Sequence, residues 1–164
     1  GAPDPASMQA FLVPWDGNPN FLAKTGYPLK RLYKDLGGLK ARRVLVALDS
    51  CFSGAGGRSV LAEGTRPLVT RLDTSVASDG AIVLLAAAAS QEVTSTLKEE
   101  GHGIFTYFLL KGLNGDAQDR SGAVTVRGLY DYLRPKVQDT ASMQGREQTP
   151  VLEGIESGED LKLR

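Results

Sequence analysis

The sequence contains one cysteine, one histidine and no excess of charge of either sign. A single cysteine excludes an internal disulfide and a four-cysteine metal site, and a free thiol favours a reducing compartment such as the cytoplasm. The 19 basic residues balance the 19 acidic residues without a basic cluster. Neither nucleic acid nor an anionic membrane is therefore an expected partner, which leaves peptides, proteins and small molecules.

Long apolar runs are also missing. The longest, residues 81–89, has about half the length that a membrane-spanning helix needs. The first residues have neither the basic region nor the apolar core of a secretion signal, and Gly1 is not an initiator methionine. We expect a soluble single domain of 164 residues that is a fragment of a longer chain.

The periodicity of apolar residues predicts a mixed α/β chain. The expected strands are 10–14, 44–48, 81–86 and an edge strand within 148–154. The expected helices are 29–39, 103–113 and one that begins after Thr125, in which Pro135 either interrupts the helix or lies in a first turn after a kink. The first strand, the first helix and the second strand follow one another closely, so they predict a βαβ unit and a partly parallel sheet. Residues 53–80 have no sustained period, which predicts a long exposed connection.

The apolar strand 44–48 ends abruptly in Asp49, Ser50 and Cys51, followed by a glycine-rich turn. Its composition predicts a strand covered on both faces. Ligands of open α/β sheets collect beyond the carboxyl ends of such strands. Backbone N–H groups of the turn can stabilise a thiolate or an oxyanion, so we interpret Cys51 as a reactive thiol. The alternative is a buried structural cysteine.

Spacing separates the chemistries that a strand-end cysteine can perform. A phosphatase loop needs an arginine six residues after the cysteine, where this chain has Gly57, and Arg58 comes one residue late. The turn also lacks the third glycine of a dinucleotide site and the lysine of a P-loop. A thioredoxin-like site needs a second cysteine. Nucleophilic attack on a peptide bond or a related acyl group remains.

The motif Leu48-Asp49-Ser50-Cys51-Phe52-Ser53-Gly54 resembles the nucleophile motif of the caspase-like cysteine peptidases, closest to metacaspases and their bacterial relatives. Three further stretches resemble family motifs in the family's order: Phe11–Asp16, Gly101–Tyr107 and Thr149–Leu152. The resemblance implies a three-layer α/β fold with a mostly parallel central sheet. The whole chain, 1–164, would be one domain with a large-subunit-like part (1–57), a linker (58–80) and a small-subunit-like part (81–164).

In that family a Cys–His dyad cleaves the peptide bond, and the histidine lies about 50 residues before the cysteine. Counted back from Cys51, this position falls just before Gly1, and Gly1-Ala2-Pro3 resembles the residues after the family's Ser-Gly-His-Gly turn. The resemblance therefore implies that the histidine, with the first strand and helix, precedes Gly1. We expect the chain to be inactive alone and to need that N-terminal segment, which could be a separate chain. For His102 we expect a capping or packing role.

The resemblance assigns roles to further residues. Asp49 matches the acid that binds the arginine or lysine before the scissile bond; its alternative role is that of a turn former at the strand end. Gly1 matches the glycine whose N–H joins that of Cys51 in the oxyanion hole. Three linker arginines are candidate self-cleavage sites: Arg58, Arg66 and Arg71.

Calcium activates many metacaspases through a cluster of acidic residues, but the nearest candidates here are scattered: Asp73, Asp79, Glu99 and Glu100. We expect no cofactor and no metal. The expected function is endopeptidase activity after Arg or Lys on a peptide or protein substrate. Two other functions stay open, a non-catalytic scaffold on the same fold and a small-molecule cysteine hydrolase.

Overall fold

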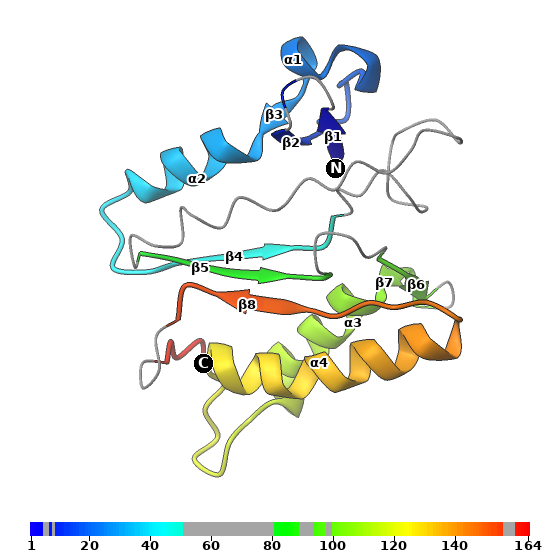
Figure 1. Ribbon diagram of the computed structural model, residues 1–164. Coiled ribbons are helices and arrows are strands. Elements are labelled where there is room, and N and C mark those ends of the chain that lie inside the picture. The colour runs from blue at the N-terminus through cyan, green and yellow to red at the C-terminus, as the bar shows by residue number, and fades with distance from the viewer. Residues whose placement is uncertain (5–6, 8, 51–80, 89–93, 98–99, 156–159) are drawn as a thin grey trace.

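The computed structural model describes residues 1–4, 7, 9–50, 81–88, 94–97, 100–155 and 160–164. It is a mixed α/β structure whose central sheet lies between two layers (Figure 1). Helix α2 (Leu29–Gly37) and a small antiparallel sheet lie on one side, and helices α3 (Ile104–Lys111) and α4 (Val126–Met143) lie on the other. This layering confirms the α/β class.

The central sheet has three strands in the order β4 (Val44–Leu48), β5 (Ile82–Ala86) and β8 (Val151–Glu153). Strands β4 and β5 are parallel and paired along their whole length, whereas β8 is antiparallel to β5. The expected parallel pair and the expected edge strand near the C-terminus are both confirmed. The prediction of a mostly parallel sheet is wrong, because β8 follows the long helix α4 and returns against β5.

The N-terminal strands form a sheet of their own. Strand β2 (Gln9–Leu12) pairs antiparallel with β1 (Ala2–Asp4) and with β3 (Tyr27–Pro28). Helix α1 (Leu22–Thr25) lies between β2 and β3 in the sequence. The predicted βαβ unit is therefore wrong, since both edges of β2 are occupied by neighbours from its own N-terminal region and β2 does not pair with β4.

The two faces of the central sheet bury different apolar clusters. Leu29 and Tyr33 of α2 pack with Ala10 of β2 against Val46 and Leu84 of the sheet. On the opposite face the core is formed by Leu85 with residues of α3 and α4, namely Ile104, Phe105, Leu129, Leu133, Val137 and Ala141. Alternation along each strand sends successive side chains to opposite faces, which explains why neighbouring apolar residues belong to different clusters.

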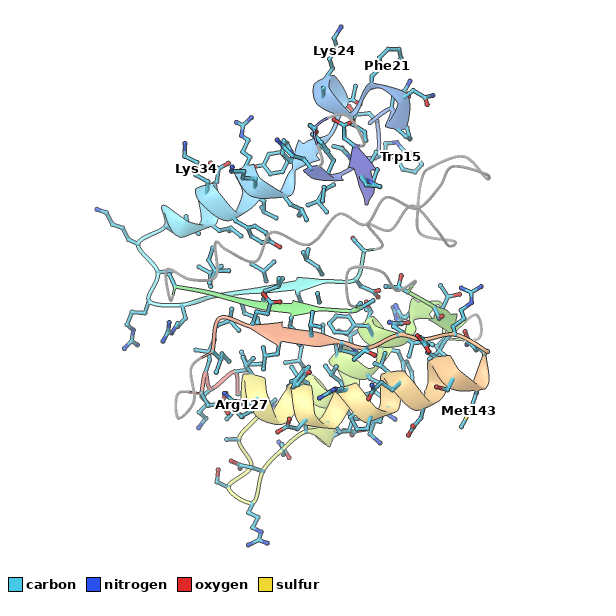
Figure 2. The ribbon with its side chains drawn as sticks, viewed as in Figure 1. Trp15, Phe21, Lys24, Lys34, Arg127 and Met143 are labelled. Atoms are coloured by element: carbon cyan, nitrogen blue, oxygen red, sulfur yellow. The ribbon has the colours of Figure 1, made fainter. Side chains whose placement is uncertain are left out.

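Helix α4 begins where the sequence predicts. The side chain of Thr125 caps it by accepting a hydrogen bond from the Gly128 backbone N–H at 3.1 Å. The expected interruption at Pro135 is wrong, because the helix continues through this residue to Met143. Pro135 is exposed, so the carbonyl left without an N–H partner lies on the solvent side of the helix. Figure 2 shows Arg127 and Met143 toward the two ends of α4.

Strands β4 and β5 differ in burial despite similar composition. Every residue of β5 is buried, whereas only Val46 is buried in β4 and Ala47 is exposed. The prediction that the strand 44–48 is covered on both faces is therefore wrong for most of its length. The difference follows from position, since β5 is the middle strand of this sheet, whereas β4 pairs with β5 alone among the described residues.

Candidate functional site

The site expected beyond β4 is represented by Asp49, which follows the last residue of that strand. Its Oδ2 accepts a hydrogen bond from the Thr106 hydroxyl at 2.5 Å and a second from the Thr106 backbone N–H at 3.3 Å. Thr106 is the third residue of α3. The carboxylate of Asp49 therefore lies at the N-terminus of this helix, where unpaired N–H groups and the helix dipole favour a negative charge.

The local sequence explains why α3 takes this acceptor from another segment. The N-cap residue is Gly103, which has no side chain to accept a hydrogen bond. The first N–H of the helix, that of Ile104, donates to the carbonyl of Ser95 at 3.0 Å. Asp49 and Ser95 thus supply acceptors that a capping side chain would otherwise provide, and they tie the start of α3 to the carboxyl end of the parallel strand pair.

A buried glutamine also holds the Ser95 segment that binds the start of α3. Gln148 is 1% exposed, donates from its amide nitrogen to the carbonyl of Ala87 at 3.1 Å, and accepts from the Ser95 N–H at 2.8 Å. One side chain therefore connects the end of β5, the segment before β6 (Thr96–Leu97) and the approach to β8. The sequence analysis assigned no role in the site to Gln148 or to Thr106. For Gln148, a signal was available in an amide placed next to an apolar strand and a proline.

His102 lies in β7 (His102–Gly103), directly before α3, and pairs with Leu97 of β6. The capping role expected for it is not observed, since Gly103 occupies the N-cap and no side chain caps the helix there. Its side chain is exposed and lines an open hollow of about 610 Å³ together with Glu100, Tyr107 and Lys111. A second hollow of about 650 Å³ shares Glu100 and Tyr107 and extends to Arg146.

A third hollow of about 1050 Å³, larger than these two, lies elsewhere. It is lined by Arg42 and Arg43, which precede β4, and by Asp160 and Lys162 near the C-terminus. Because Asp49 follows the opposite end of β4, this hollow is separated from the candidate site by the length of the strand. Volume alone therefore does not identify the site. The two smaller hollows are lined by residues of α3, the helix whose first turn binds Asp49.

Gly1 directly precedes β1, in which Ala2 is fully buried and pairs with Phe11 of β2. The neighbouring Ala10 of β2 packs in the same cluster as Val46 of β4. The structure thus places Gly1 in the layer that covers the α2 side of the central sheet.

The remaining predicted site residues lie outside the described part of the chain. These are the nucleophile candidate Cys51 and the self-cleavage candidates Arg58, Arg66 and Arg71. The expected linker 58–80 and the expected loop 53–80 also lie there.

Potential metal ligands do not gather in the described part of the chain. No group of three or more histidine, cysteine, aspartate or glutamate side chains among those residues could hold a metal ion. None of the described helices combines the length and the apolar character needed to cross a membrane.

Comparison with known proteins gave no relative: no protein-family model and no curated protein matches this sequence. The interpretation of the site therefore depends on its motifs and its geometry.

Proposed function

We propose that this chain is part of a caspase-like cysteine endopeptidase that cleaves after Arg or Lys. The observation that carries the proposal is the position of Asp49. Its carboxylate lies at the carboxyl end of a parallel strand, two residues before Cys51, and is held by the first turn of α3. A fixed carboxylate beside a thiol is suited to binding a cationic side chain next to the bond that the thiol attacks.

In the proposed reaction the Cys51 thiolate attacks the carbonyl carbon of the scissile bond, and a histidine from the segment before Gly1 protonates the leaving amine. The backbone N–H groups of Gly1 and Cys51 stabilise the oxyanion. Water then releases the acyl group from the thiol. No cofactor enters these steps. Without the histidine, turnover by residues 1–164 is expected to be very low.

The hydrogen bonds of Asp49 are compatible with binding a substrate cation. Thr106 supplies two donors, both to Oδ2, and a carboxylate held in this way can still attract a cationic side chain through its charge. The same hydrogen bonds also support a purely structural role, in which Asp49 only caps α3. The two roles differ in whether the negative charge or only the acceptor oxygen is required.

The decisive protein is the chain extended by its native sequence before Gly1. We expect it to cleave fluorogenic peptides after Arg or Lys and to lose activity on Cys51→Ala, while His102→Ala keeps most activity. Cleavage after Asp alone would refute the role of Asp49, and activity that survives Cys51→Ala would exclude this nucleophile. Chelators are expected to leave the rate unchanged.

The variant Asp49→Asn separates the two roles of Asp49. Asparagine keeps an acceptor oxygen for Thr106 but removes the charge, so the fold should persist while cleavage after Arg and Lys is lost. If Asp49→Asn retains full activity on basic substrates, Asp49 acts only as a cap. Mass spectrometry of the incubated protein would show whether cleavage occurs after Arg58, Arg66 or Arg71, with Cys51→Ala as the control.

Two results would favour the alternative function as a non-catalytic scaffold. A residue other than histidine immediately before Gly1, or a correctly folded extended chain without peptidase activity, would favour a non-catalytic interaction domain. Turnover of small acyl substrates but not of peptides would instead favour a small-molecule cysteine hydrolase.

A further inference from the structure

Helix α2 presents basic side chains to the solvent. Its buried residues, Leu29 and Tyr33, pack in the cluster that covers the central sheet. Because successive residues of a helix are rotated by about 100°, the opposite side of α2 carries Lys30, Arg31 and Lys34. All three basic residues are exposed. The outer side of this layer is therefore positively charged along the helix.

The positive charge extends beyond both ends of α2. Lys24 of α1 precedes the helix and Lys40 follows it, and both are exposed. Figure 2 shows Lys24 and Lys34 pointing away from the central sheet. Residues 21–42 contain six basic residues and one acidic residue, Asp35, which forms an ion pair with Arg31 at 3.6 Å. We define the basic face as Lys24, Lys30, Arg31, Lys34 and Lys40.

The layer on the other side of the sheet has a different distribution of charge. Along α4 the basic residues Arg127, Arg134 and Lys136 are interspersed with Asp131 and Asp139. The net charge of the whole chain is zero, so the excess of positive charge in residues 21–42 is balanced elsewhere. The expectation of no anionic partner used that net charge, whereas an extended anionic surface meets only one face of the protein.

An exposed apolar side chain lies next to each end of the basic face. Phe21 is 58% exposed and comes three residues before Lys24, and Leu39 is 55% exposed and directly precedes Lys40. Figure 2 shows Phe21 and Lys24 at the same end of the layer. Apolar side chains that enter the boundary between headgroups and acyl chains add to the attraction between basic residues and anionic lipids. This combination favours a lipid surface over a nucleic acid.

We propose that the basic face binds an anionic membrane surface, with Phe21 and Leu39 entering the headgroup region. This proposal is independent of the peptidase activity. Clusters of four to eight Lys or Arg residues on an amphipathic helix are typical of binding to anionic lipids such as phosphatidylserine, and each residue strengthens adsorption about fivefold. The basic face has five such residues on and beside α2. Binding through exposed charges of this kind is reversible and sensitive to salt.

The first test is cosedimentation of the 164-residue protein with vesicles of equal parts phosphatidylserine and phosphatidylcholine. We expect binding that is absent with pure phosphatidylcholine. It should be largely lost when NaCl rises from about 0.1 M to about 1 M, because the Debye length falls from about 10 Å to about 3 Å. Lys30→Gln combined with Lys34→Gln should weaken binding about 25-fold. The matched control, Arg134→Gln with Lys136→Gln, removes the same charge from α4 and should leave the affinity unchanged.

The second test separates a membrane from other anionic partners. Leu39→Ser should weaken vesicle binding roughly fivefold, because a leucine side chain no longer leaves water. The same variant should not alter any weak binding to duplex DNA or to polyglutamate, which have no apolar interior. Met143→Ser is the matched control, since Met143 is 87% exposed on α4 and lies outside the basic face. Unfolding curves of all variants confirm that each is folded.

Five results would overturn the proposal. The first three are no binding to phosphatidylserine vesicles at about 0.1 M salt, equal binding to pure phosphatidylcholine, and equal weakening by the control pair on α4. The fourth is tighter binding to duplex DNA or polyglutamate than to vesicles, which would assign the basic face to a nucleic acid or an acidic protein. The fifth comes from the chain extended by its native sequence before Gly1. If it does not bind while residues 1–164 bind, the upstream segment covers the basic face in the longer protein.

Discussion

Asp49 and Thr106 are 57 positions apart in the sequence and meet through two hydrogen bonds at one carboxylate oxygen. The pair joins the carboxyl end of β4 to the first turn of α3. It therefore connects the part of the chain that contains the candidate nucleophile to the C-terminal helical layer. If Asp49 binds substrate, Thr106 orients its carboxylate.

Thr106→Val tests this connection. Valine has nearly the same shape but cannot donate to Asp49, so one charged-acceptor hydrogen bond is lost while the backbone bond can remain. We expect the free energy of unfolding to fall by about 1–3 kcal/mol in urea denaturation. Thr106→Ser should restore most of the loss. The control Thr140→Val changes a threonine on α4 and should have a much smaller effect; equal effects would show that the Asp49 bond does not stabilise the fold.

Gln148→Met tests the buried amide. Methionine has a similar length but leaves the Ser95 N–H and the Ala87 carbonyl without this partner, at a cost of about 1–3 kcal/mol for each unsatisfied group. Chemical denaturation should show this loss, and hydrogen exchange should be faster at Ser95. Gln118→Met, at an exposed glutamine, is the matched control and should change stability little. Unchanged exchange at Ser95 in Gln148→Met would contradict the assigned role.

Gly154 combines two constraints that can be measured separately. Its φ is +79°, and an added Cβ would meet the backbone carbonyl oxygen of Ile82. Gly122 has a similar φ of +81° with open space around it. Gly122→Ala should therefore report only the conformational cost of about 1 kcal/mol, whereas Gly154→Ala should cost clearly more because β8 must shift from β5. Equal losses of stability would show that the strand contact adapts freely.

The pKa of Tyr132 is raised to about 12, first by burial and then by its hydrogen bond to Asp116. The folded protein thus keeps the phenol protonated in a range where the unfolded chain loses the proton. This contribution to stability is complete below pH 10 and is lost as the pH rises from about 10 to about 12. Tyr132→Phe should flatten this part of the stability curve. Because the pKa of Tyr27 is also raised by its hydrogen bond to Asp35, titration of tyrosinate absorbance should show one fewer late-titrating group in the variant than in the wild type.

Several elements could be predicted because their signals are local. The helical spacing of Leu29, Leu32 and Leu36 and the following glycines located α2, and Thr125 located the start of α4. The apolar run before Asp49 located β4 to the residue. The partner strands of β2 could not be predicted, since antiparallel pairing with β1 and β3 depends on contacts between short segments that have no strong pattern of their own.

The sequence by itself determined the α/β class, the end of an apolar strand at Asp49, and a motif that limits the chemistry expected of Cys51. These features depend on residues adjacent in the chain, where composition and period are sufficient. Only the tertiary structure decided that Asp49 binds the first turn of α3, that Gln148 connects the end of β5 to the segment before β6, and that β4, within the described part of the chain, pairs with β5 alone. Hydrogen-bond partners from distant segments and the neighbours of a strand are set by how layers pack, and a linear pattern does not specify them.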